Sequence, residues 1–148
     1  MDAYDKAEQE IKKSLAQIDN LSERLLTMVK ILKATFEKHH WVGIYLKEGE
    51  NLILHNYIGL PTIHTKIPIN EGICGAAVRE KHTVIVADVM SDPRYIACSL
   101  GTRSEIVVPI YKGIEIIGEI DIDSDYPNAF NYRDQEFLER VAQEITKF

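Results

Sequence analysis

Residues 94–124 read RYIACSLGTRSEIVVPIYKGIEIIGEIDIDS, which is two apolar runs separated by a lysine-glycine turn signal. In the second run, residues 116–123, isoleucine and glycine alternate with a set of positions that carries Asp121 and Asp123. Successive side chains of a β-strand point to opposite faces, so these acids share one face and most of the isoleucines lie on the other. A hairpin would place Glu105, on the preceding run, beside both aspartates. The sequence therefore predicts a hairpin with acidic side chains gathered on one face.

A cysteine precedes this hairpin. Cys98 lies seven residues before Glu105, in a polar connection at 88–101 that follows an apolar strand at 82–87. Connections of this length are often functional, so we expect the Cys98 thiol to face the acids. Two plainer interpretations stay open at this point. In one, Cys98 is only a small apolar residue of a loop. In the other, the acids line a sheet face that is exposed to solvent.

The other elements follow from periodicity and turn residues. Helices are expected at 3–17, 21–40, 73–80 and 133–148, strands at 41–46 and 52–58, and a short extended piece at 65–69. This order predicts a single α+β domain over 1–148, with a mostly antiparallel sheet, terminal helices on one face and a ligand pocket on the other. Residues 1–40 form the N-terminal helix pair, and 41–148 form the sheet, the pocket and the closing helix.

Two features of the helix pair suggest further roles. The first helix has a narrow apolar stripe that includes Ile11 and Leu15, which indicates a docking or dimer face, and we expect a homodimer through this pair. The adjacent His39 and His40 are interpreted as favourable charge at the C-terminus of the second helix.

The strand at 41–46 has one aliphatic face and one aromatic face, and the aromatic face carries Trp41 and Tyr45. These two rings either wall a pocket or belong to an ordinary core, and the pattern alone favours neither.

Composition excludes several classes of function. The chain has 148 residues, 45% of them hydrophobic, and a net charge of −6, so we expect it to bind neither nucleic acid nor an anionic membrane. It has no signal-peptide pattern at its start and only two cysteines, which favours the cytoplasm. The five histidines show no zinc-binding spacing, so no metal site is expected.

Four segments of the chain, WVGIYL, KIPINEGICGAAV, YIACSLGTRSEIVVPI and IIGEIDIDS, resemble the GAF domain family and, within it, the free methionine-(R)-sulfoxide reductases. The resemblance implies that Cys98 is the catalytic cysteine and that Glu105, Asp121 and Asp123 hold the substrate, free methionine sulfoxide. It also implies that Trp41 and Tyr45 wall the sulfur end of that substrate.

The chemistry that the resemblance implies needs a thiolate and an acid together. A thiolate attacks the sulfoxide sulfur, the departing oxygen receives a proton, and the product is a cysteine sulfenic acid that a second thiol reduces. We expect Cys98 and Glu105 to be catalytic, because crowded carboxyl groups retain a proton near neutral pH. No bound cofactor is implied.

The chain departs from the family pattern at one point. Family members commonly carry a third cysteine shortly before the KIPI-like segment, where this chain has the sequence Ile-His-Thr at 63–65. The oxidised Cys98 is then reduced either by Cys74 or directly by a small thiol or a thioredoxin-like protein. From the residues around it, Cys74 is interpreted first as a packing residue of a short helix, and its use as the second thiol is the alternative.

Two other functions fit the same fold. One is a noncatalytic GAF sensor that binds a small molecule, such as a cyclic nucleotide, and signals through its terminal helices. An acidic pocket face should repel a phosphate group, which makes this a weaker interpretation. The other is a structural protein with an empty pocket.

Overall fold

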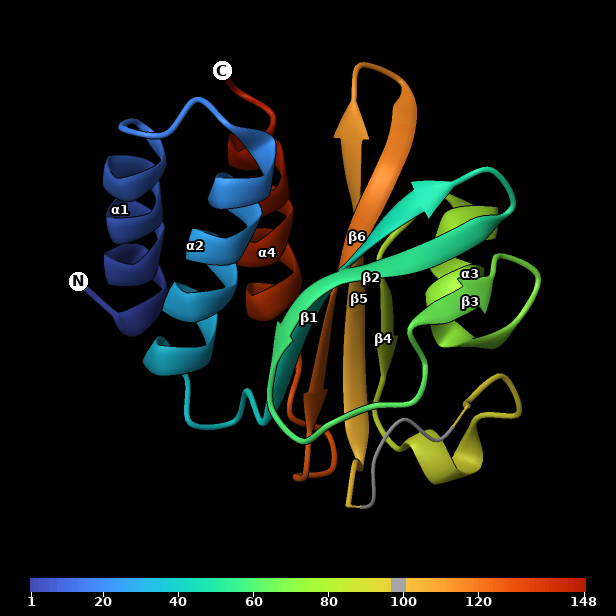
Figure 1. The fold of residues 1–148 in the computed structure, drawn as a ribbon. Helices are drawn as coiled ribbons and strands as arrows, with labels where there is room; N and C mark the ends of the chain where they lie inside the picture. The colour runs from blue at the N-terminus through green and yellow to red at the C-terminus, as the bar shows by residue number, and fades with distance from the viewer. Residues whose placement is uncertain (97–100) are drawn as a thin grey trace.

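A six-stranded sheet in the order β3-β2-β1-β6-β5-β4 forms the centre of the computed structural model, which describes residues 1–96 and 101–148 (Figure 1). Every neighbouring pair of strands is antiparallel. The elements are α1 (Ala3–Leu15), α2 (Leu21–Thr35), β1 (Trp41–Glu48), β2 (Asn51–Ile58), β3 (Lys66–Pro68), α3 (Gly72–Glu80), β4 (Val84–Val86), a 3₁₀ turn (Val89–Ser91), β5 (Ser104–Lys112), β6 (Glu115–Ser124) and α4 (Tyr132–Ile145). The predicted α+β architecture is confirmed.

The helices divide between the two faces of the sheet. Helices α2 and α4 pack against β1, β2 and β5, and α1 lies across α2 and α4 as an outer layer (Figure 1). Helix α3 covers the opposite face. Each face has its own buried apolar cluster, and the larger one lies under α1, α2 and α4. The sheet therefore separates a helical core from a second face. In the described part of the chain, the short helix α3 is the only α-helix that covers this second face.

The apolar stripe of α1 does not form a docking face. Its residues Ala7, Ile11 and Leu15 are each 1% exposed and belong to the core of the chain itself. The prediction that this stripe is a dimer surface is wrong, because α2 and α4 together form the groove that it fills. None of the helices in the described part of the chain is long and apolar enough to cross a membrane.

Arg24 of α2 joins the ends of three helices. Its buried guanidinium donates hydrogen bonds of 2.5–3.1 Å to five backbone carbonyl oxygens, those of Leu15, Ile18, Glu144, Ile145 and Lys147. The last carbonyls of a helix lack partners within the helix and carry partial negative charge, so a cation is a suitable donor there. Arg24 thus satisfies the C-terminal ends of α1 and α4 together.

The expected role of His39 as a charge at a helix end is wrong. Helix α2 ends at Thr35, and the chain turns back so that His39 is buried against Phe36 and Phe130. Its Nδ1 lies 3.0 Å from the carbonyl oxygen of Leu32. Burial lowers the pKa of His39 to about 4, so the ring is neutral near pH 7. It satisfies a helix-end carbonyl by a hydrogen bond and without a charge.

This burial predicts a loss of stability on acidification. Between pH 6.5 and about pH 4 the unfolded chain binds a proton at residue 39 that the folded chain does not, so stability falls as pH falls through this window. Between pH 7 and pH 5, the unfolding free energy of the wild type should fall by about 2 kcal/mol more than that of His39→Gln, because glutamine does not titrate. Urea unfolding at the two pH values measures this difference.

The matched control is His82→Gln, which alters an exposed histidine and should keep the wild-type loss. Equal losses in His39→Gln and the wild type would show that residue 39 is not buried in its neutral form.

Candidate functional site

Four carboxylic acids lie buried together on the sheet face beneath α3. Glu105 comes from β5, and Glu119, Asp121 and Asp123 come from alternate positions of β6; each is at most 3% exposed. Glu105 pairs with Asp123 across the two strands. We call these four residues the acid face. The alternative that they line a solvated sheet surface is excluded, because α3 and the neighbouring strands cover them.

Cys74 of α3 completes this cluster. Its thiol donates a hydrogen bond to Oδ2 of Asp121, with a sulfur–oxygen distance of 3.3 Å. Burial, together with the nearby charges of Asp121, Glu119 and Glu105, raises the pKa of Cys74 well above its usual value. Cys74 is therefore a protonated thiol at neutral pH in this arrangement.

The acid face retains protons for the same reason. Burial and the charge of Asp121 raise the pKa values of Glu119 and Asp123 well above their usual range. Burial also raises the pKa of Asp121, but hydrogen bonds with Glu105, Cys74 and Asp123 favour its charged form. Asp121 is thus the group of these three best placed to hold the negative charge, with neutral carboxyl groups on either side of it in the strand.

Several oxygens of the acid face lack partners. Both carboxylate oxygens of Glu119, Oδ1 of Asp121 and Oδ1 of Asp123 are buried without a hydrogen bond to any described residue. Unpaired buried acceptors are uncommon and costly in folded proteins. The face therefore has the capacity to accept hydrogen bonds from a molecule that enters it.

Aromatic rings extend the acid face along β1. Trp41 pairs with Asp123 and stacks against Tyr57, with ring centroids 5.3 Å apart, and Tyr45 lies further along the strand. A β-carbon on Gly43 would overlap the indole ring, so glycine at this position lets Trp41 lie flat over the strand. Since Gly43 pairs with Asp121, the indole covers the strand directly beside the acids.

The polar atoms of both rings bind loop carbonyls. Trp41 Nε1 donates to the carbonyl oxygen of Leu60 at 3.0 Å, and Tyr45 donates its hydroxyl to that of His64 at 2.8 Å. Both rings are buried in the smaller apolar cluster. The two sequence interpretations thus both hold for Trp41, which is a core residue and also lines a cavity.

That cavity opens at the Asp123 end of the acid face. It has a volume of about 350 Å³, and its lining includes Lys33, Trp41, Leu60, Thr102 and Asp123. A much smaller space, with room for about one water molecule, lies on the β5 side of the acid face among Ile96, Cys74 and Glu105. Two cavities therefore reach the acid face, one at Asp123 and one at Glu105.

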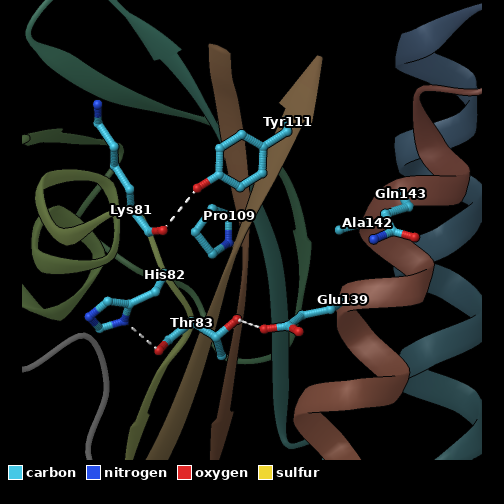
Figure 2. Close-up of a pocket in the computed structure, with 8 residues that line it drawn as sticks. All are labelled: Lys81, His82, Thr83, Pro109, Tyr111, Glu139, Ala142 and Gln143. Carbon is cyan, nitrogen blue, oxygen red and sulfur yellow. Dashed lines mark hydrogen bonds between the residues drawn. The ribbon is translucent and has the colours of Figure 1, made fainter. Parts of the chain in front are cut away.

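A separate cavity of about 280 Å³ lies between the end of α3, β5 and α4 (Figure 2). Figure 2 shows that Tyr111 donates a hydrogen bond to the carbonyl oxygen of Lys81 and that Thr83 donates one to Glu139 across this space. None of the residues predicted from the sequence lines it. It holds none of the acids or aromatic rings described above, so it is not the candidate site.

The structure brings most of the predicted residues together. Cys74, Glu105, Asp121, Asp123, Trp41 and Tyr45 all lie on one face of the sheet, whereas Cys98 lies outside the described residues. Glu119 was not singled out from the sequence. Its position has the same parity as Asp121 and Asp123 along β6, and that signal was sufficient to include it.

Comparisons with known proteins match this arrangement. The GAF domain family model matches residues 20–147. GAF domain-containing protein A of Dictyostelium discoideum is 38% identical over 143 residues, which are 92% of this chain and 90% of that protein. Free methionine-R-sulfoxide reductase of Saccharomyces cerevisiae is 40% identical over 112 residues, 73% of this chain and 62% of that protein.

A solved structure is similar over nearly the whole chain. The free methionine-R-sulfoxide reductase of Neisseria meningitidis, in complex with its substrate, has a TM-score of 0.93 and 34% identity. The match covers 97% of this chain and 86% of that chain. The similarity therefore includes both the helical core and the sheet that carries the acid face.

The burial of Glu119 predicts that the stability of the folded chain falls as the pH rises. Its raised pKa means that the folded chain holds a proton that the unfolded chain releases above about pH 4.5, so stability falls as pH rises. Between pH 5 and pH 8 we expect the unfolding free energy of Glu119→Gln to fall less than that of the wild type, because glutamine has no proton to release. Urea unfolding at both values tests this.

Glu115→Gln provides a control on the same strand, because Glu115 is exposed. An identical pH dependence in Glu119→Gln and the wild type would mean that Glu119 is ionised in the folded chain.

Proposed function

The chain belongs to the GAF domain family, and on that premise we propose that it reduces free L-methionine (R)-sulfoxide to methionine with electrons from a thiol. The observation that carries this proposal is the acid face, buried beside Trp41, in a chain that resembles reductases of this substrate over almost its whole length. A sensor that binds an anionic nucleotide would not bury four carboxylic acids at its pocket.

Cys98 is the proposed nucleophile. This assignment rests on the IAC-x6-E pattern, since Cys98 lies outside the described residues. Ile96, two residues earlier in the chain, lines the small cavity together with Cys74 and Glu105. The described chain thus reaches this cavity two residues before the proposed nucleophile.

The proposed reaction transfers one oxygen atom. The Cys98 thiolate attacks the sulfoxide sulfur, the sulfur–oxygen bond breaks, and the oxygen ends as the hydroxyl of a cysteine sulfenic acid while methionine is released. A second thiol then displaces water from the sulfenic acid and forms a disulfide, and a further thiol reduces that disulfide. Two thiol electrons are consumed in each cycle.

The acid face serves two purposes in this proposal. A neutral carboxyl group, with Glu105 as the candidate, donates the proton that the sulfoxide oxygen needs. Asp121 and Asp123 accept hydrogen bonds from the substrate ammonium group, which would also pair their unsatisfied oxygens. Lys33 lines the same cavity as Asp123, so the pocket offers a cation for the carboxylate of a free amino acid.

Trp41 and Tyr45 provide the apolar wall for the sulfur end of the substrate. Both rings are fixed by hydrogen bonds to loop carbonyls, so they form a rigid surface. A rigid wall beside the acids would hold the sulfoxide in one orientation, which favours one of its two diastereomers.

Cys74 is the candidate for the second thiol, with a small thiol or a thioredoxin-like protein as the external reductant. It lies against Asp121, close to the acids. Its raised pKa makes it a slow nucleophile in the resting arrangement, so its use as the resolving thiol requires a partner base or a movement of the site. We further propose that residues 1–148 act as one GAF unit in a reducing compartment such as the cytoplasm.

The deciding assay mixes the purified chain with each diastereomer of free methionine sulfoxide and dithiothreitol and measures methionine. We expect turnover of the R diastereomer only, and a loss of at least about a thousandfold in Cys98→Ser, since a hydroxyl does not replace the thiolate. Undiminished activity in Cys98→Ser would end the proposal of a cysteine mechanism. No activity with either diastereomer would favour the sensor.

The role of Cys74 is separable from the first chemical step. If Cys74 resolves the sulfenic acid, Cys74→Ser should release one methionine per chain in a single turnover and then stop when thioredoxin is the reductant. If a small thiol resolves it directly, steady turnover with dithiothreitol should persist. Quenched-flow measurement of the first turnover distinguishes these results from a variant that has simply unfolded.

A further inference from the structure

Three side chains with metal-ligand atoms meet beneath α3. Cys74 comes from α3, Glu105 from β5 and Asp121 from β6, and all three are buried. One ligand atom of each lies within 4.8 Å of the other two. Because the three residues come from separate elements, no ligand spacing along the sequence indicates that they lie together.

Their separations are close to those of a tetrahedral zinc site. With bonds of about 2.3 Å to sulfur and about 2.0 Å to oxygen, a sulfur and an oxygen on one tetrahedral zinc ion lie about 3.5 Å apart. The thiol sulfur of Cys74 is 3.3 Å from Oδ2 of Asp121. The ligand atom of Glu105 would need to approach the other two by about 1.5 Å at most, which a side-chain rotation supplies.

An independent observation points to a missing ligand. Both oxygens of Glu119 and Oδ1 of Asp121 are buried and have no hydrogen-bond partner among the described residues. Glu119 lies two residues before Asp121 on the same face of β6, so its carboxyl group borders the three proposed ligands. In the described part of the chain, no ion pair joins Glu119 or Asp121 to a basic side chain. The negative charge that these groups can carry is therefore not balanced by protein cations.

The donor set selects the class of cation. One thiolate with two carboxylates suits a borderline dication such as Zn²⁺ or Co²⁺. Mg²⁺ and Ca²⁺ prefer oxygen donors throughout and more of them, and Cu⁺ prefers additional sulfur. Three protein ligands leave one position of a tetrahedral ion open.

We propose that Cys74, Glu105 and Asp121 form a binding site for Zn²⁺ or a similar borderline dication. The ion would bind to the thiolate form of Cys74, with release of the thiol proton. A further consequence, which rests on the proposed function, is that the bound ion occupies carboxylates needed by the sulfoxide substrate and so inhibits the reductase in competition with it.

Binding is tested without any sulfoxide. The chain, reduced with a phosphine and freed of metal, is titrated with Co²⁺ while the absorption spectrum is recorded, and Zn²⁺ affinity is measured by competition with a chromophoric chelator. We expect a near-ultraviolet thiolate-to-cobalt band, the visible bands of tetrahedral Co²⁺, and displacement of both by Zn²⁺.

Conservative variants identify the ligands. Cys74→Ser should abolish the thiolate band, and Glu105→Gln and Asp121→Asn should each weaken Zn²⁺ binding by at least about tenfold. Cys98→Ser is the matched thiol control and should keep the band. Circular dichroism of each variant establishes that it is folded, and Zn²⁺ should raise the Tm of the wild type but not that of Cys74→Ser.

The absence of a thiolate band in the wild type, or its persistence in folded Cys74→Ser, overturns the site. These outcomes are independent of the reductase assay. A chain that binds Zn²⁺ without reducing sulfoxide would support the proposed metal site and contradict the proposed function. In an active chain, a rise in the apparent KM with added Zn²⁺ at constant kcat supports competition, and no change in KM excludes it.

Discussion

The burial of four carboxylic acids on one face of the sheet is the constraint on which the rest of this molecule depends. Each acid loses its hydration on burial, so the face is tolerated only with retained protons, mutual hydrogen bonds or an external cation. Burial raises the pKa values of Glu119 and Asp123, which favours retained protons, and the Cys74 thiol donates a hydrogen bond to Asp121. The unpaired oxygens show that this compensation is incomplete.

The opposite face of the sheet compensates for that cost. Helices α1, α2 and α4 bury a large apolar cluster against β1, β5 and β6, and Arg24 joins the helix ends by five hydrogen bonds. The strands that carry the acids are therefore held from behind by apolar burial, the dominant favourable term in folding. Stability and chemistry are located on opposite faces of the same strands.

The same protonated face suits several kinds of guest. An ammonium group would pair the ionised oxygens, a sulfoxide oxygen would accept a proton from a neutral carboxyl group, and a dication would replace protons on Cys74 and its neighbours. On the two proposals, these guests would compete because they use the same few oxygens.

Much of this arrangement was predictable from local sequence patterns. The alternation along β6 and the turn between β5 and β6 are set by neighbours in the chain, and each was correctly located. The pattern also placed Glu105 beside Asp123, since a hairpin fixes its own register.

Other features depend on segments that are distant in the sequence. The sequence allows the acids to face either water or the protein interior. They are buried because α3 packs over β5 and β6. In the same way, tertiary packing placed Cys74 against Asp121 and buried His39 as a neutral ring. It also buried the apolar stripe of α1 in the core of the same chain. Sequence by itself determined which side chains share a face, because backbone geometry is local; the tertiary structure decided what each face meets, because desolvation depends on whatever packs against it.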